Sequence, residues 1–149
     1  MKKIGEYTVR GQFDTSLSDM ERITLFDGRF DTAYRVVKMQ VCQRDRLENS
    51  AEAASVKLAT DPTGNNNRTW EFQNNQEIAW AICNADANSA SVTSPDPIID
   101  PDNMIVEDLY IGGYSYSDTE KVNYIITLHK YYISDWKGEL TMVRNRSQA

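Results

Sequence analysis

Residues 122–129 read VNYIITLH, the most β-rich run of the chain. Apolar side chains occupy every second position of this run, namely Val122, Tyr124, Ile126 and Leu128. Side chains alternate between the two faces of a strand, so this period is typical of a strand with one face against a core. The run therefore predicts a half-buried β-strand.

The same period returns on both sides of that run. Residues 33–42 continue the β pattern, with Val37, Met39 and Val41 alternating against Lys38 and Gln40. Residues 54–58 also alternate, and residues 78–83 are apolar at both parities. A run that is apolar on both faces indicates a central strand of a packed structure. Residues 104–111 resume an extended pattern, which we expect Gly112-Gly113 to break.

Turn-forming residues separate these runs. Residues 22–26 alternate and end at Asp27-Gly28, a pair that predicts a tight hairpin because glycine accepts a positive φ. Asp61-Pro62 and the asparagines that follow predict a loop. Residues 86–103 hold three of the four prolines and predict a long surface connection, a length that is uncommon without a function.

Short strands with uneven loops, and no alternating helices to cover a parallel sheet, predict an all-β fold. We expect one domain over residues 1–149, an antiparallel β-sandwich of jelly-roll type, with an immunoglobulin-like sandwich as the alternative. Residues 1–13 predict a strand or an N-terminal arm. In the tail, residues 134–149, Trp136, Leu140 and Val143 have a helical spacing and predict a short C-terminal helix.

Charge and hydropathy exclude several classes of protein. Sixteen Lys and Arg against 22 Asp and Glu give a formal net charge of −6, the wrong sign for a broad phosphate-binding face, so nucleic acid is not the expected ligand. No apolar run reaches the length of a membrane span, and residues 1–13 lack the apolar stretch of a signal peptide. We expect synthesis in the cytoplasm and no membrane contact.

No sequence motif of catalysis or of cofactor binding is present in the chain. His129 is the single histidine and has no nucleophile or metal ligand at a recurring spacing. Cys42 and Cys83 fall in apolar runs and are expected to be buried thiols, with a disulfide as the alternative if their strands are neighbours. We expect no enzyme activity, no cofactor and no metal.

Acidic residues are concentrated in the middle of the chain. Residues 69–120 contain no lysine or arginine and ten of the 22 acids. A solvated loop is the expected role of residues 96–103, with a calcium site or a small hydrolase using Asp100 and Asp102 as alternatives. The acidic region could also dock against a basic neighbour, since the chain ends are basic.

Eight tyrosines and three tryptophans provide rigid rings with polar tips, which serve in cores, interfaces and sugar-binding faces alike. A carbohydrate-binding module on a receptor-binding appendage is therefore a second functional hypothesis. It requires exposed rings in a row, for which Trp70 and Tyr114 are the test positions.

Four stretches carry a resemblance to a known class of protein. They are ITLFDGRF at 23–30, YRVVKMQV at 34–41, VNYIITLHKYYISDW at 122–136 and MVRNRSQ at 142–148. In these stretches the chain resembles small virion structural proteins of marine bacteriophages. The resemblance implies a capsid, cement (decoration) or minor structural subunit, located in the virion and present in many copies.

Under this interpretation the two ends of the chain contact neighbouring subunits. The partners would be further copies of the chain, other virion proteins, or both. The candidate interface residues are Tyr7, Arg10 and Phe13 near the N-terminus and Trp136, Arg144 and Arg146 near the C-terminus. Such contacts would act through area, strand exchange and multivalency.

Overall fold

The structure is a computed structural model of the 149-residue chain that describes residues 2–16, 19–29, 31–43, 52–62, 69–86, 91–93, 96–116 and 121–133. These residues form β-strands and no helix. The strands are β1 (Lys2–Asp14), β2 (Glu21–Ile23), β3 (Thr32–Gln43), β4 (Glu52–Ala59), β5 (Glu77–Asp86), β6 (Ser91–Thr93), β7 (Ile98–Ile99), β8 (Leu109–Tyr116) and β9 (Lys121–Tyr132). The expectation of an all-β chain is confirmed for the described residues.

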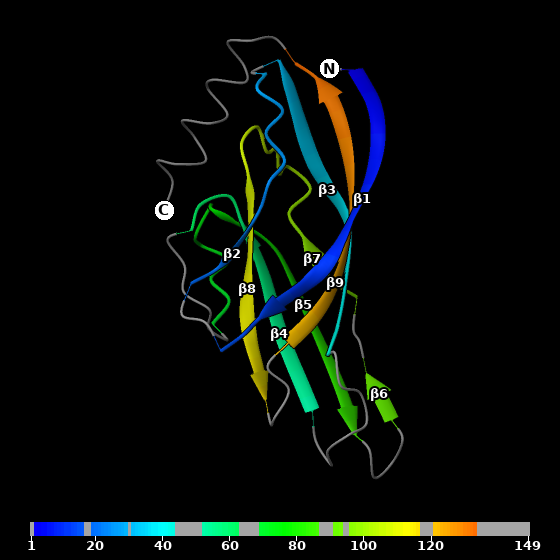
Figure 1. Cartoon of the computed structure of the whole chain (residues 1–149), viewed down its shortest axis with the longest axis vertical. Coiled ribbons are helices and arrows are strands. Elements are labelled where there is room, and N and C mark those ends of the chain that lie inside the picture. The colour runs from blue at the N-terminus through cyan, green and yellow to red at the C-terminus, as the bar shows by residue number, and fades with distance from the viewer. Residues whose placement is uncertain are drawn as a thin grey trace.

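The strands form two antiparallel sheets (Figure 1). Sheet A has the order β1-β9-β3. Sheet B has the order β2-β8-β4-β5-β6, and β7 also pairs with β5. Sheet A reaches beyond sheet B at the end of the molecule where the N-terminus lies (Figure 1). Strands that are neighbours in the chain are therefore often in different sheets.

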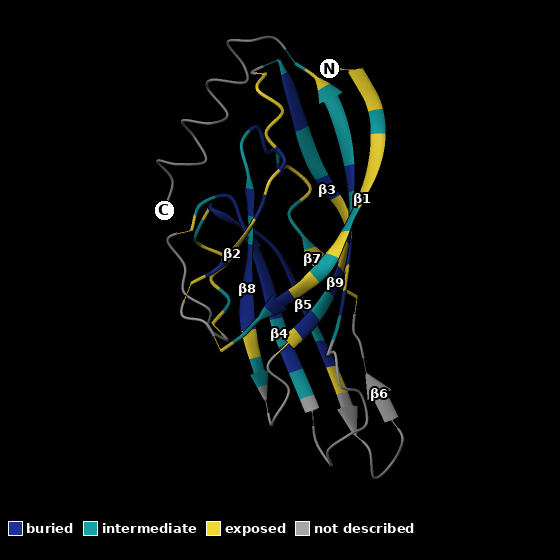
Figure 2. Cartoon of the chain, viewed as in Figure 1, coloured by how far each residue is buried: buried dark blue, intermediate teal, exposed yellow. Residues whose placement is uncertain are grey.

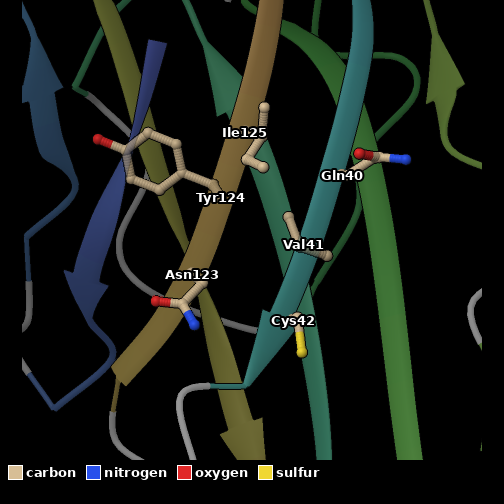
Figure 3. A pocket seen from close by; sticks show the side chains of 6 residues that line it. All are labelled: Gln40, Val41, Cys42, Asn123, Tyr124 and Ile125. Carbon is tan, nitrogen blue, oxygen red and sulfur yellow. The ribbon is translucent and has the colours of Figure 1, made fainter.

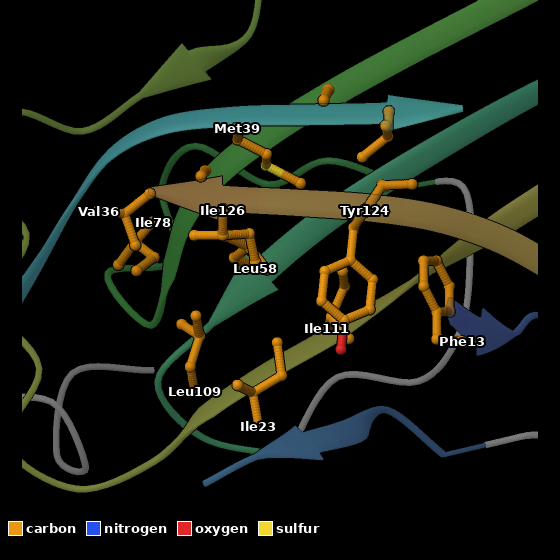
Figure 4. Close-up of a cluster of buried hydrophobic side chains, with 14 of the residues drawn as sticks. Phe13, Ile23, Val36, Met39, Leu58, Ile78, Leu109, Ile111, Tyr124 and Ile126 are labelled. Carbon is orange, nitrogen blue, oxygen red and sulfur yellow. The ribbon is translucent and has the colours of Figure 1, made fainter. Parts of the chain in front are cut away.

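The two sheets share one hydrophobic core. Inward side chains of β9 and β3 meet those of β4, β5 and β8, and Figure 4 shows them filling the space between the sheets. Among the largest fully buried side chains are Phe13, Met39, Leu58, Leu109, Ile111, Ile126 and Leu128. Burial of this apolar surface is the main stabilising contribution to such a fold.

Several predicted strands are confirmed. The run at 122–129 lies within β9, the central strand of sheet A, with its even-numbered side chains buried from Val122 to Leu128. The run at 78–83 lies within β5, which pairs with β4 on one side and with β6 and β7 on the other. Residues 54–58 lie within β4. Period and apolar content were sufficient here because these strands are central and buried.

The hairpin predicted at Asp27-Gly28 is wrong. Gly28 does have a positive φ of 85°, and the Asp27 carboxylate accepts a hydrogen bond from the Arg29 N–H at 3.0 Å. However, β2 pairs with β8 in sheet B while β3 pairs with β9 in sheet A. The turn therefore carries the chain from one sheet to the other instead of joining two paired strands.

The break predicted at Gly112-Gly113 is also wrong, because β8 continues through both glycines. A Cβ at Gly113 would overlap the carbonyl oxygen of Ser55 and lie 2.9 Å from the Cα of Val56. Glycine at this position permits the close approach of β8 to β4. In this strand glycine is a packing requirement and not a strand terminator.

The segment 69–76, which contains Trp70, forms turns and folds over the outer face of sheet B. The backbone carbonyl of Thr69 accepts a hydrogen bond from the Lys57 ammonium group, and the Phe72 ring lies edge-on to Trp80 with centroids 4.6 Å apart. The long connection at 86–103 contains the short strands β6 and β7, so it is only partly a surface loop.

The N-terminal segment belongs to sheet A. Residues 2–14 form β1, which pairs with β9 over its whole length, so the N-terminal segment is a sheet strand. The predicted C-terminal helix, in residues 134–149, lies outside the described residues.

Candidate interaction surface

The outer face of sheet A carries exposed side chains on β1, β9 and β3. On β9 the odd-numbered side chains point away from the core, since the even-numbered ones are buried. Ile125 is in the middle of this row and is 43% exposed. Its neighbours across the sheet are Arg10 of β1 and Gln40 of β3. An apolar side chain is thus presented between two polar ones.

Two shallow depressions flank Ile125. One, of about 200 Å³, lies between β9 and β3 and is lined by Gln40, Val41 and Cys42 together with residues 123–125 (Figure 3). The other, of about 430 Å³, lies between β9 and β1 and is lined by residues 10–12 together with residues 123–125. Neither set of lining residues includes an acid or a histidine. Ile125 thus forms an apolar ridge between the two depressions.

Charged groups on sheet A lie opposite Ile125, at Arg10, and further along β9, beside His129 and Tyr131. The Glu6 carboxylate lies 3.3 Å from the Lys3 ammonium group and 3.6 Å from His129 Nε2. The Arg35 guanidinium lies over the Tyr131 ring, 5.4 Å from its centroid. Arg10 is exposed and makes no side-chain hydrogen bond or ion pair with any residue that the structure describes. Its guanidinium is therefore available to a partner.

The two edges of sheet A are arranged differently. At β3 the Asn103 amide caps the edge: its Oδ1 accepts from the Val36 N–H at 2.9 Å and its Nδ2 donates to the Val36 carbonyl at 3.1 Å. Ile105 adds two backbone hydrogen bonds to Tyr34. At β1, within the described chain, β9 is the one partner strand, and β1 is exposed along most of its length (Figure 2). The β1 edge is the open one.

A buried ion pair lies under the segment 69–76. The Lys57 ammonium group is 3.4 Å from the Glu77 carboxylate, and the two side chains are 3% and 4% exposed. Glu77 Oε1 also accepts from the Trp80 indole N–H at 2.9 Å and from the Glu71 backbone N–H at 3.1 Å. Since these groups are enclosed and hydrogen-bonded to one another, this cluster holds the segment on sheet B.

A second ion pair joins the turn after β2 to sheet A. Lys130 of β9 lies 2.7 Å from the Asp27 carboxylate and 5.2 Å from the Tyr34 ring centroid. Burial alone would raise the pKa of Asp27, but hydrogen bonds from Lys130, the Arg29 N–H and the Thr32 hydroxyl outweigh it and lower the pKa. The hydrogen bond to Asp27 is the main cause that raises the pKa of Lys130.

The structure separates the predicted interface residues. Tyr7 and Arg10 are exposed on β1, whereas Phe13, at 2% exposure, belongs to the core. The Phe13 side chain points inward because the odd-numbered side chains of β1 from Tyr7 to Phe13 face sheet B. Trp136, Arg144 and Arg146 lie outside the described residues.

Sequence reasoning missed Ile125 and the β1 edge. The sequence does contain a signal for Ile125: it is an apolar residue among the odd-numbered positions of the run 122–129, which are otherwise polar. The open edge had no such signal, since the position of a strand within a sheet depends on its partners.

The structure also places the two cysteines and the acidic loop at residues 96–103. Cys83 is buried in sheet B and Cys42 lines a depression on the outer face of sheet A, so no disulfide joins them. In the loop considered for calcium, the Asp100 carboxylate accepts the backbone N–H of Asp102 at 3.0 Å. The described residues contain no group of three or more His, Cys, Asp or Glu side chains suited to a metal ion.

The two rings considered for sugar binding are far apart in the chain and differently exposed. Tyr114 is 40% exposed on β8, and Trp70 is partly buried with its indole N–H enclosed.

Comparison with protein-family models, with curated proteins and with solved structures finds no match to this chain. In the part of the chain that is described, no helix has the length and apolar character required to cross a membrane.

Proposed function

We propose that this chain is a structural subunit of a phage virion, as a capsid, cement or minor component, and that it acts through protein–protein contacts. Its fold in this proposal is an antiparallel β-sandwich of jelly-roll type with a short helix within residues 134–149. Two antiparallel sheets with a common core support the sandwich. The sequence resemblance supports the virion role.

One observation carries the proposal of a contact surface. Ile125 projects from the middle strand of sheet A, between two depressions whose lining contains no acid and no histidine. Interfaces bind through apolar anchors surrounded by polar side chains that exclude water. A neighbouring subunit that covers Ile125 would enclose an apolar anchor within a rim of polar side chains, and the sheet would not have to change its conformation.

The experiment is co-sedimentation of the full chain with purified particles of the phage that encodes it, compared with an Ile125→Lys variant. We expect the wild-type chain to sediment with particles. The Ile125→Lys variant should bind at least roughly tenfold more weakly, because it places a charge in the apolar centre of the contact. Ile98→Lys is the matched control, since Ile98 is also an exposed strand isoleucine, at 48%, but lies in sheet B.

Three outcomes bear on the proposal. Binding by the wild type and by Ile98→Lys but not by Ile125→Lys supports it. A wild-type chain that does not bind particles and is absent from them by mass spectrometry overturns the virion role. Equal binding by all three chains overturns the assignment of the contact to the outer face of sheet A.

A further inference from the structure

The open edge of β1 is long and regular. From Gly5 to Asp14, β1 pairs with β9 without interruption, and the irregularity in the register is confined to Lys3–Gly5. The backbone groups on the far side of this strand have no partner strand among the described residues. An edge of this kind pairs readily with another strand. The edge of β3, by contrast, is capped by Asn103 and Ile105.

The sequence of β1 complements itself when it is reversed. Residues 5–11 read GEYTVRG, so an antiparallel copy centred on Thr8 brings Thr8 opposite Thr8, Glu6 opposite Arg10, Tyr7 opposite Val9 and Gly5 opposite Gly11. Opposite charges, aromatic with β-branched residues, and paired threonines are the cross-strand combinations that stabilise an antiparallel pair. Within residues 5–11, each side-chain pair of this register, apart from the glycines, belongs to one of these combinations.

Geometry selects this register. Directly opposed side chains of an antiparallel pair lie on the same face, so a symmetric pair must match residues of equal parity. Centring the pair on Tyr7 places Glu6 opposite Thr8, and centring it on Val9 places Arg10 opposite Thr8. Both shifts lose the two ion pairs. The register centred on Thr8 is the one that pairs Glu6 with Arg10 twice.

The side chains that this register requires lie at the surface. Glu6 and Arg10 are both exposed on the outer face, and Arg10 has no side-chain partner among the described residues. Tyr7 is exposed and Val9 half-buried on the inner face. Glu6 keeps its contacts to Lys3 and His129 within its own subunit while a further cation approaches from the open side.

We propose that two copies of this chain form a twofold-symmetric dimer by antiparallel pairing of β1 with β1, centred on Thr8. The pairing joins two copies of sheet A into one continuous sheet with three strands from each chain. This dimer does not depend on the virion role, because the strand that pairs with β1 is β1 of a second copy of the same chain. The dimer also places two Ile125 ridges on one face of a common sheet.

Charge exchange tests the register. In sedimentation-equilibrium measurements on the full chain we expect a wild-type dimer, and Glu6→Arg and Arg10→Glu should each weaken it roughly tenfold or more, because each creates two like-charge contacts. An equimolar mixture of the two variants should associate again, since each supplies the charge that the other requires. The double variant Glu6→Arg/Arg10→Glu should also dimerise.

Cross-linking tests the centre. In a Cys42→Ser background, Thr8→Cys should form an intermolecular disulfide on mild oxidation, because opposed residues of an antiparallel pair lie within disulfide distance. Gln12→Cys is the matched control on the same strand and face, and it should not cross-link to itself, since this register places Gln12 opposite Ile4 of the second copy.

A wild-type chain that stays monomeric at the highest attainable concentration overturns the proposal. So does a dimer that both single charge variants leave unchanged, or a mixture of the variants that fails to associate while each remains folded by circular dichroism. Failure here leaves particle binding through Ile125 unaffected, so the two proposals are tested separately.

Discussion

Lys57 and Glu77 are residues at which a single substitution should be strongly destabilising. Each is almost fully enclosed between sheet B and the segment 69–76, and each depends on the other for compensation of its charge. Removal of one member of a buried pair leaves an uncompensated charge, which is strongly destabilising.

We therefore expect Lys57→Met to lower the free energy of unfolding by about 3–5 kcal/mol. Urea denaturation followed by tryptophan fluorescence measures this, since Trp80 donates its indole N–H to Glu77. The control is Lys38→Met, at an exposed lysine of β3, which should change stability by less than about 0.5 kcal/mol. The double variant Lys57→Met/Glu77→Gln should lose less than Lys57→Met alone. Equal losses would mean that the pair is not coupled.

Asp27 should make stability depend on pH at the acidic end. Its pKa in the folded state is below the ordinary value of 3.8, so its carboxylate stabilises the fold fully above that value. The contribution is lost as the pH falls through the lower, folded-state pKa. Lys130 acts in the opposite range, since its raised pKa gives stability that is lost as the pH rises through the folded-state value.

The test is Asp27→Asn compared with the wild type. At neutral pH the variant should be less stable by about 1 kcal/mol, because charge-assisted hydrogen bonds to Lys130 and Thr32 are weakened. The difference should shrink as the pH falls below 3.8 and vanish once Asp27 is protonated in the folded state as well. Asp102→Asn, at an exposed acid, is the control. A gap that is constant with pH would exclude the ion pair as its cause.

At the scale of elements, the cap on β3 depends on one side chain. Asn103 is 2% exposed and hydrogen-bonds the backbone of Val36 and the carbonyl of Asp100. It therefore takes the place of a neighbouring strand at this part of the edge. Alanine at this position would leave buried backbone groups without partners, which is costly.

Asn103→Ala should lower the free energy of unfolding by about 2–3 kcal/mol. It should also accelerate amide hydrogen exchange at Val36, which is the more specific measurement because it reports on the edge itself. Asn123→Ala, at a half-buried asparagine of β9, is the control and should leave exchange at Val36 unchanged. Unchanged exchange at Val36 in Asn103→Ala would show that the cap does not protect the edge.

At the scale of the whole molecule, folding redistributes the charge pattern of the sequence. The acidic middle of the chain has no cations of its own, yet Glu77 pairs with Lys57 and Asp108 with Arg22. Both cations come from earlier in the chain and reach the acids across sheet B. The acidic region is therefore partly neutralised within the fold, which weakens the argument for docking through that region alone.

In the described part of the chain, sheet A leaves one face and one edge open. Its inner face is buried against sheet B, whereas its outer face and its β1 edge are exposed. Both proposed contacts use this sheet: particles through the face at Ile125, and a second copy through the edge at Thr8.

Local pattern was enough to identify the central strands. The alternation at 122–129 and the doubly apolar run at 78–83 reflect burial, and burial leaves a period in the sequence. The positive φ of Gly28 was likewise foreseeable from Asp-Gly. The assignment of β2 and β3 to different sheets was not, because the same turn serves a hairpin or a crossing between sheets.

The remaining features depend on which strands become neighbours. Alternation tells which side chains share a face, and it is the same for an edge strand and a central one. Whether Phe13 lies in the core, whether β1 has an open side, and whether Asn103 meets Val36 are set by contacts between residues distant in the chain. The strands could be predicted because alternation is a local property of the sequence. The open edge and the exposed face could not, because strand pairing is non-local and decides which strand lies at the edge of a sheet.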